Sequence, residues 1–178
     1  ANSKVSVHTF DIKSKVTRKM KLPLDPDGYI PRIRFTQDAA KLAIMTLNRN
    51  QNRFDLYFAD PRSTLCKLVL RDESPYYINE SVFDNIMFYP QNFSFISEKD
   101  GYSHLYWYSM GGNLVKQVTK GKFEVKRFIG WDAATNTFYF ESNEESPLRT
   151  AVYKTDKKGG RIKLSEKAGT NSAIFSSN

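Results

Sequence analysis

The sequence is poor in the residues that build several common kinds of site. Its 178 residues include one cysteine, Cys66, and two histidines, His8 and His104. A lone cysteine excludes an internal disulfide framework and any metal site made of several cysteines. No apolar run approaches the roughly 18 residues that a membrane-spanning helix needs. We therefore expect no disulfide scaffold, no metal site, no cofactor and no direct membrane insertion.

Acidic residues are outnumbered by basic ones. Lysine and arginine total 27 against 19 aspartate and glutamate residues, which gives a net charge of +8. Such a balance permits binding to a polyanion. The basic residues are, however, spread along the chain, and no basic helix or RNA-binding aromatic motif accompanies them. We expect a solvated basic surface and no nucleic-acid partner; a nucleic-acid binder would show affinity that falls steeply with salt.

Aromatic residues are abundant, and the apolar pattern has a period of two. The chain has 13 Phe and 10 Tyr, which suit half-buried strands and not a disordered chain. Residues 30–35, 54–58 and 127–131 alternate as strands do, and turn residues such as Gly111-Gly112 separate such runs. About fifteen short strands fit this spacing, so the fold class is all-β.

An internal repeat favours one all-β architecture. Aromatic-rich strands end in turns at positions 11, 60, 110 and 156, at intervals of 49, 50 and 46 residues. Four strands per repeat of this length are typical of β-propeller blades. We expect a partial β-propeller of about three to four four-stranded antiparallel blades, and an irregular β-sandwich is the alternative.

The repeat also predicts the blade boundaries. A blade remnant at 4–22 precedes full blades at 29–72, 82–120 and 123–165, and a further blade starts at 170–178. This number of blades cannot close a ring, because propellers typically have four to eight. The chain is therefore expected to be part of something larger.

Four stretches are similar to a known family. They are residues 29–36 (YIPRIRFT), 97–106 (SEKDGYSHLY), 117–121 (QVTKG) and 142–148 (SNEESPL). In this order they resemble the N-terminal propeller domain of bacterial dipeptidyl peptidase IV-like serine peptidases, which belong to the prolyl-oligopeptidase type. The resemblance covers nearly the whole chain.

The resemblance implies an eight-bladed propeller that covers a C-terminal α/β-hydrolase domain of the parent chain. That domain carries a Ser-Asp-His triad and removes Xaa-Pro or Xaa-Ala dipeptides from peptide substrates. The propeller gates access and helps to recognise the substrate or a second subunit in a possible homodimer. The implied location is the periplasm or the cell surface. The alternative is a free-standing extracytoplasmic binding propeller that is completed by self-association or by a partner.

No catalytic residue is predicted in this chain. An α/β-hydrolase presents its serine in a Gly-x-Ser-x-Gly turn, and no such motif occurs. His8 and His104 lie within predicted strands, where structural roles are expected, and His104 is expected to make a structural hydrogen bond.

Two acidic pairs resemble ligand sites but are better explained otherwise. The resembled family binds the substrate ammonium with adjacent glutamates, but that pair precedes the part present here. Glu144-Glu145 is therefore expected to be a solvated loop between two strands. Asp25 and Asp27 resemble the start of a calcium loop without its later ligands, so a turn is expected there.

One segment is a candidate for contact with substrate. Residues 73–80 (ESPYYINE) connect two predicted blades and combine aromatic with polar side chains. In propellers such connections often lie near the central funnel. We predict Tyr77 and Asn79 as substrate-binding residues, and loop packing is the alternative role.

Overall fold

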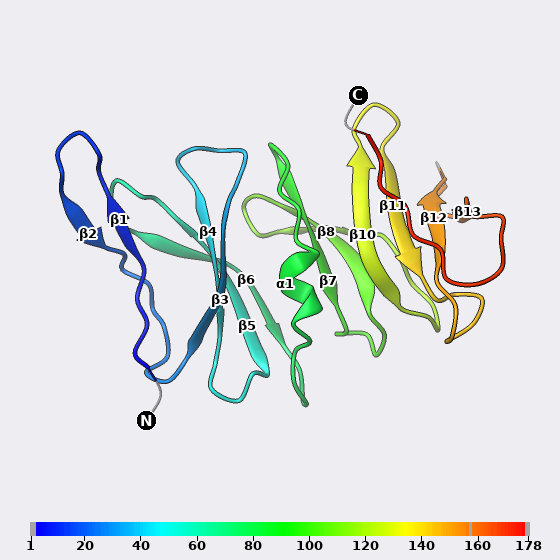
Figure 1. Ribbon diagram of the computed structural model, residues 1–178, viewed down its shortest axis with the longest axis horizontal. Helices are drawn as coiled ribbons and strands as arrows, with labels where there is room; N and C mark the ends of the chain where they lie inside the picture. Colours follow the sequence, from blue (N-terminus) through cyan, green and yellow to red (C-terminus); the bar gives the residue numbers. More distant parts are fainter. Residues whose placement is uncertain (1–2, 157, 177–178) are drawn as a thin grey trace. The chain divides into compact units, whose positions relative to one another are not determined.

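A computed structural model describes residues 3–156 and 158–176, and within them the chain is almost entirely β (Figure 1). The described residues form four antiparallel sheets in which each strand pairs with its neighbour in sequence. The strands are β1 (His8–Phe10), β2 (Thr17–Lys19), β3 (Tyr29–Phe35), β4 (Leu42–Leu47), β5 (Arg53–Ala59), β6 (Cys66–Glu73), β7 (Asn92–Ser97), β8 (His104–Ser109), β9 (Leu114–Gln117), β10 (Val125–Asp132), β11 (Thr137–Ser142), β12 (Ala151–Thr155) and β13 (Arg161–Lys163), with one helix, α1 (Ser81–Asp84). The expected all-β fold is confirmed.

The chain divides into two compact units. The first contains residues 1–83, 88–91 and 110–112, and the second contains the remainder. The first unit holds the β1-β2 hairpin and the four-stranded sheet β3-β4-β5-β6, and the second holds β7-β8-β9 and β10-β11-β12-β13.

The core of the first unit lies on the two central strands of its large sheet. Apart from their first residues, β4 and β5 are buried throughout, because both faces of the sheet are covered. Apart from Thr46 and Asp55, the buried residues of these strands are apolar and do not simply alternate with polar ones. Val7 and Met20 of the hairpin pack against Ile44 and Tyr57 of the sheet, so one apolar cluster joins the two sheets of this unit.

A charge pair between the buried Asp55 and the partly exposed Arg71 links β5 to β6 in the same sheet. Arg71 donates two hydrogen bonds to the Asp55 carboxylate, from Nε at 2.7 Å and from Nη2 at 2.8 Å. Asp55 is only 4% exposed, so its charge needs this bidentate partner. The pKa of Arg71 is raised, chiefly by the hydrogen bonds to Asp55, and the guanidinium stays charged.

The repeated turns found in the sequence recur in the structure. The carboxylates of Asp11, Asp60 and Asp156 each accept a hydrogen bond from the backbone N–H two residues later, at 2.8 to 2.9 Å. Such side-chain-to-backbone bonds reproduce a tight turn. The third turn instead uses Gly112, which has φ of 94° and whose added Cβ would lie 2.2 Å from the Val69 carbonyl oxygen.

The sheet that begins at β7 departs from the predicted four strands. Val82 and Phe83 lie in helix α1 and are buried, although the predicted blade starts at Val82. Between α1 and β7, Met87 makes two hydrogen bonds to Ser94 of β7, and the Asn85 carbonyl accepts a third from the Ser94 hydroxyl. The buried Asn85 side chain accepts a hydrogen bond from the Phe128 amide at 2.9 Å. A few hydrogen bonds made by residues 85–87 therefore take the place of the predicted first strand of this repeat.

The expected strand at Ala173–Phe175 is also absent from the described residues. Glu141 holds this stretch by accepting hydrogen bonds from the Ser172 hydroxyl at 2.7 Å and the Ala173 amide at 3.2 Å. A first strand of a blade would need a second strand beside it, and residues 3–156 and 158–176 contain none for this position. Residues 177 and 178 of the predicted blade start lie outside the described part. The blade boundaries as such stay a prediction.

His104 is a structural residue, as expected from the sequence. Its ring is fully buried, with Nδ1 3.0 Å from the Thr119 hydroxyl and Nε2 3.0 Å from the Gly121 carbonyl oxygen. Because a carbonyl only accepts, Nε2 carries the proton and Nδ1 accepts from Thr119. The ring also meets Phe123 edge-on at 5.0 Å. His104 thereby ties the segment after β9 to the start of β8.

We predict that His104→Phe lowers the free energy of unfolding by about 2–4 kcal/mol, because Thr119 and the Gly121 carbonyl lose their buried partner. Phenylalanine keeps the ring and its packing on Phe123. The matched control is His8→Phe, since the His8 side chain is exposed and contacts the nearby Ser6 hydroxyl, and it should change stability by less than about 0.5 kcal/mol. Equal urea-denaturation midpoints for the two variants would contradict the assignment.

Candidate functional site

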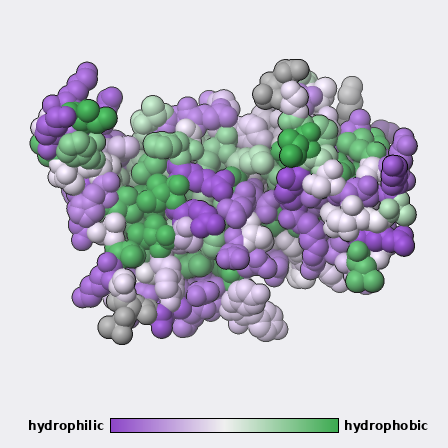
Figure 2. All heavy atoms as spheres, viewed as in Figure 1, coloured by the Kyte–Doolittle hydropathy of each residue, from purple (hydrophilic) through white to green (hydrophobic). Residues whose placement is uncertain are grey.

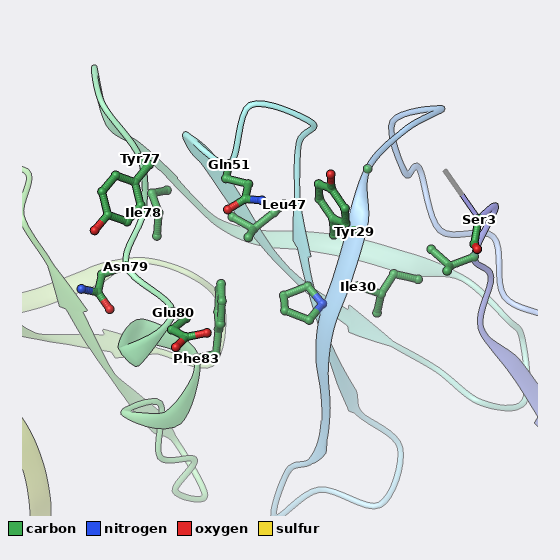
Figure 3. A pocket seen from close by; sticks show the side chains of 13 residues that line it. Ser3, Tyr29, Ile30, Leu47, Gln51, Tyr77, Ile78, Asn79, Glu80 and Phe83 are labelled. Carbon is green, nitrogen blue, oxygen red and sulfur yellow. The ribbon is translucent and has the colours of Figure 1, made fainter. Parts of the chain in front are cut away.

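The candidate site is a cavity of about 720 Å³ in the first unit (Figure 3). This volume falls within the range of about 300–1,000 Å³ that is usual for ligand pockets. Its walls come from the N-terminal segment, the start of β3, the β4–β5 turn and the linker that leads to α1. The lining residues are Ser3, Val5, Gly28, Tyr29, Ile30, Pro31, Leu47, Gln51, Tyr77, Ile78, Asn79, Glu80 and Phe83.

The linker that forms one wall is held by the β4–β5 turn. The Ser74 amide donates to the Asn52 carbonyl at 2.9 Å, and the Ile78 amide donates to the Gln51 carbonyl at 2.7 Å. The Ile78 side chain is buried, at 7% exposure. Burial and these hydrogen bonds fix the linker at both ends, so the side chains between them are presented from a defined backbone.

The turn that holds the linker is itself fixed by a side chain. The side-chain oxygen of Asn48, Oδ1, accepts hydrogen bonds from the backbone amides of Asn52 and Arg53, both at 3.0 Å. Gln51 adopts φ of 55° in this turn, a left-handed conformation that is uncommon for residues other than glycine. The turn therefore presents its carbonyl groups to the linker in a fixed direction.

Both sequence-predicted residues line the cavity. Tyr77 is 63% exposed, and the Asn79 side-chain oxygen accepts a hydrogen bond from the Ser81 amide at 2.9 Å at the start of α1. In Figure 3, the Tyr77 hydroxyl points away from Tyr29, while the Glu80 carboxylate points toward the Phe83 ring. Asn79 thus has a local structural role in addition to its place in the wall, and substrate binding by Tyr77 and Asn79 stays a prediction.

Tyr29 and Glu80 are among the lining residues that sequence reasoning did not single out. Tyr29 faces the cavity from β3, and its ring and hydroxyl are both contacted by the Arg49 guanidinium, which lies 5.8 Å from the ring centroid. The proximity of Tyr29 to the linker could not be found from sequence, since 48 positions separate it from Tyr77. Glu80 is adjacent to Asn79, and its direction depends on the turn into α1.

Both histidines make hydrogen-bond contacts within the described part of the chain. His104 contacts a hydroxyl and a carbonyl, and His8 contacts Ser6. Residues 3–156 and 158–176 contain no group of three or more His, Cys, Asp or Glu side chains that could hold a metal ion. In the same residues, no helix has the length and apolar character needed to span a membrane.

Glu144 and Glu145 lie in the loop between β11 and β12, as expected, and each forms an ion pair there. Glu144 receives two hydrogen bonds from Arg161, and Glu145 lies 2.7 Å from Lys163 Nζ. Arg161 also stacks on the Phe123 ring, 4.7 Å from its centroid. Both carboxylates therefore have cationic partners on β13, which leaves the pair without the free charge that an ammonium ligand would need.

Asp25 has a structural partner as well. Its carboxylate lies 2.5 Å from Arg53 Nη2, and its carbonyl accepts a hydrogen bond from the Gly28 amide at 2.9 Å. These contacts close the turn that precedes β3, as expected from the sequence.

The glutamate pair lies near the buried Tyr153 and contributes to the shift of its pKa. Burial raises the pKa of Tyr153 to about 12, and the nearby Glu145 and Glu144 carboxylates add to the shift. A phenol with a raised pKa keeps its proton in the folded state at a pH where the unfolded chain, with a pKa of about 10, has lost it. By linkage, this contribution to stability is complete below about pH 10 and is lost as the pH rises toward 12.

We predict that the free energy of unfolding falls between pH 9 and pH 11.5, and that Tyr153→Phe reduces this fall by about 1–2 kcal/mol. Urea denaturation of both proteins at the two pH values measures the difference. An unchanged fall in the variant would show that Tyr153 does not contribute to the alkaline loss of stability.

The sheets with sequential antiparallel strands define the class of this protein: they are blades of a partial β-propeller. Residues 1–178 match the family model for the N-terminal region of dipeptidyl peptidase IV. The chain belongs to this family.

Solved structures of two proteins resemble the chain. Dipeptidyl peptidase 4 of Porphyromonas gingivalis has 43% sequence identity and a TM-score of 0.94, with 99% of this chain and 25% of that chain covered. A putative dipeptidyl aminopeptidase IV from Bacteroides ovatus has 21% identity and a TM-score of 0.68, over 85% of this chain and 24% of that chain. The second likeness shows the fold alone. The chain thus spans about a quarter of the length of the proteins that it matches.

Proposed function

We propose that this chain is the non-catalytic propeller portion of a dipeptidyl peptidase IV-like serine peptidase that removes Xaa-Pro or Xaa-Ala dipeptides. The observation that carries this proposal is the match to P. gingivalis dipeptidyl peptidase 4 at 43% identity over 99% of the chain. In this proposal, a C-terminal α/β-hydrolase domain of the parent chain supplies the catalytic triad. The enzyme acts in the periplasm or at the cell surface.

The propeller portion would gate access to the hydrolase domain and help to recognise the peptide substrate or a second subunit. The blades would correspond to residues 4–22, 29–72, 82–120, 123–165 and the start of a further blade at 170–178. The cavity supports a role in recognition, because it combines apolar and aromatic walls with a few polar groups, the usual composition of a ligand site.

The parent polypeptide provides the direct test. We expect the full-length protein to hydrolyse Gly-Pro-p-nitroanilide, and we expect a Gly-x-Ser-x-Gly motif downstream of this region. The absence of both, together with a stable closed dimer of this chain in solution, would favour the alternative of a free-standing binding propeller.

We predict that Tyr77→Ala in the full-length enzyme lowers kcat/KM for peptide substrates by about fivefold, because an aromatic contact contributes roughly 1 kcal/mol. Tyr76→Ala is the matched control: Tyr76 is 82% exposed and adjacent in sequence but does not line the cavity. Steady-state kinetics with a pentapeptide that carries proline at its second position gives both values. Unchanged kcat/KM in Tyr77→Ala would remove Tyr77 from the site.

We predict that Glu144→Gln leaves KM for the same peptide within about twofold of the parent value, because Arg161 already occupies the carboxylate and an exposed pair contributes little. The same variant should slightly lower the thermal unfolding midpoint. A tenfold or larger rise in KM would instead assign substrate binding to Glu144.

A further inference from the structure

The segment that forms one wall of the cavity is locally acidic in an otherwise basic protein. From Glu73 to Glu98 the chain contains no lysine or arginine, although the net charge of the whole chain is +8. Glu73 and Glu80 lie within this segment beside the predicted Tyr77 and Asn79. A local surplus of negative charge attracts cations to this part of the surface.

Glu80 places one of these charges in the cavity wall. Its side chain extends from the residue that precedes α1, and its carboxylate lies beside the Phe83 ring, which lines the same cavity (Figure 3). Over residues 3–156 and 158–176 we find no hydrogen bond or ion pair of this carboxylate. The other two glutamates considered for ligand binding, Glu144 and Glu145, are both paired.

The remaining walls suit the rest of a long cationic side chain. Tyr29, Tyr77 and Phe83 supply aromatic rings, whose faces attract cations. The Arg49 guanidinium already lies over the Tyr29 ring, 5.8 Å from its centroid, so Tyr77 and Phe83 are the rings left for a ligand cation. Ile30 and Leu47 add aliphatic surface against which methylene groups can pack.

Figure 2 shows that apolar and strongly polar residues also lie side by side on the surface of the first unit. A purely apolar pocket would favour an apolar ligand. An acidic group within apolar and aromatic walls favours a ligand that has a cationic head and an aliphatic stem.

We propose that the cavity binds the ammonium or guanidinium group of a lysine or arginine side chain of the peptide substrate, beyond the dipeptide that is removed. Glu80 is then a specificity-determining residue that pairs with the cation, while the apolar wall covers its stem. This inference rests on the proposed function. A lysine or arginine side chain fits better than the amino terminus, because an α-ammonium group has no aliphatic stem to use the apolar wall.

The experiment uses the full-length enzyme and pentapeptides that begin with Gly-Pro. One series carries lysine at the third, fourth or fifth position, and a second series carries the uncharged norleucine, which preserves most of the stem. Each peptide is assayed with the parent enzyme, with Glu80→Gln and with Glu73→Gln. Glu73 is the matched control, because it is an exposed acid of the same segment that does not line the cavity.

We expect the parent enzyme to prefer lysine to norleucine at one position by about three- to tenfold in kcat/KM, the range for an exposed ion pair aided by aromatic contacts. Glu80→Gln should abolish this preference mainly through KM, and Glu73→Gln should retain it. No preference at any position, or a preference that survives in Glu80→Gln, would overturn the inference.

Gly-Pro-p-nitroanilide separates the two sources of cation, because its only cation is the amino terminus. We expect Glu80→Gln to lose at least about threefold more kcat/KM on the preferred lysine peptide than on this compound. An equal loss on this compound would assign the Glu80 charge to the amino terminus and overturn the side-chain site. If the parent enzyme does not hydrolyse this compound at all, the proposed peptidase function fails, which is distinct from failure of the Glu80 inference.

Discussion

The burial of central strands on both faces is the constraint on which this fold depends. In β4 and β5 nearly every side chain is buried, so neither strand can be stable in an isolated sheet with one face in water. Within the first unit, Val7 and Met20 of the hairpin cover one such face at Ile44 and Tyr57. Within the second, Trp107 of β8 meets Phe138 of β11 edge-on at 5.0 Å. Each sheet needs a neighbour to complete its core, as is usual in repeat architectures.

Polar side chains connect these apolar layers wherever the chain leaves a strand. His104 joins Thr119 to the Gly121 carbonyl, and Glu141 holds the backbone of Ala173. The Asn85 side-chain oxygen accepts a hydrogen bond from the Phe128 backbone amide. Because buried backbone groups must have partners, these few side chains determine where irregular segments can run. The same rule places the candidate site, since hydrogen bonds to the Gln51 and Asn52 carbonyls hold the linker that forms its wall.

The contrast among the glutamates shows why function cannot be assigned from residue type alone. Glu144 and Glu145 resemble an ammonium site in sequence, yet Arg161 and Lys163 on β13 already neutralise them. Glu80 does not resemble such a site in sequence, and it lines a cavity whose walls include aromatic side chains. Whether a carboxylate can bind a cationic ligand thus depends on whether another part of the chain, such as β13, already supplies it with a cationic partner.

By itself the sequence determined the all-β class, the repeat of sequential strands and their turns, because alternation, turn residues and spacing are local properties. It also indicated Tyr77 and Asn79 as neighbours of a possible site, and the structural role of His104. Only the tertiary structure decided that residues 81–84 form a helix, that Ala173–Phe175 is held without a strand partner and that Tyr29 and Glu80 share a cavity with Tyr77. These features depend on contacts between residues far apart in the chain. A local sequence pattern does not indicate which distant residue will hydrogen-bond to a backbone group or pair with a charge.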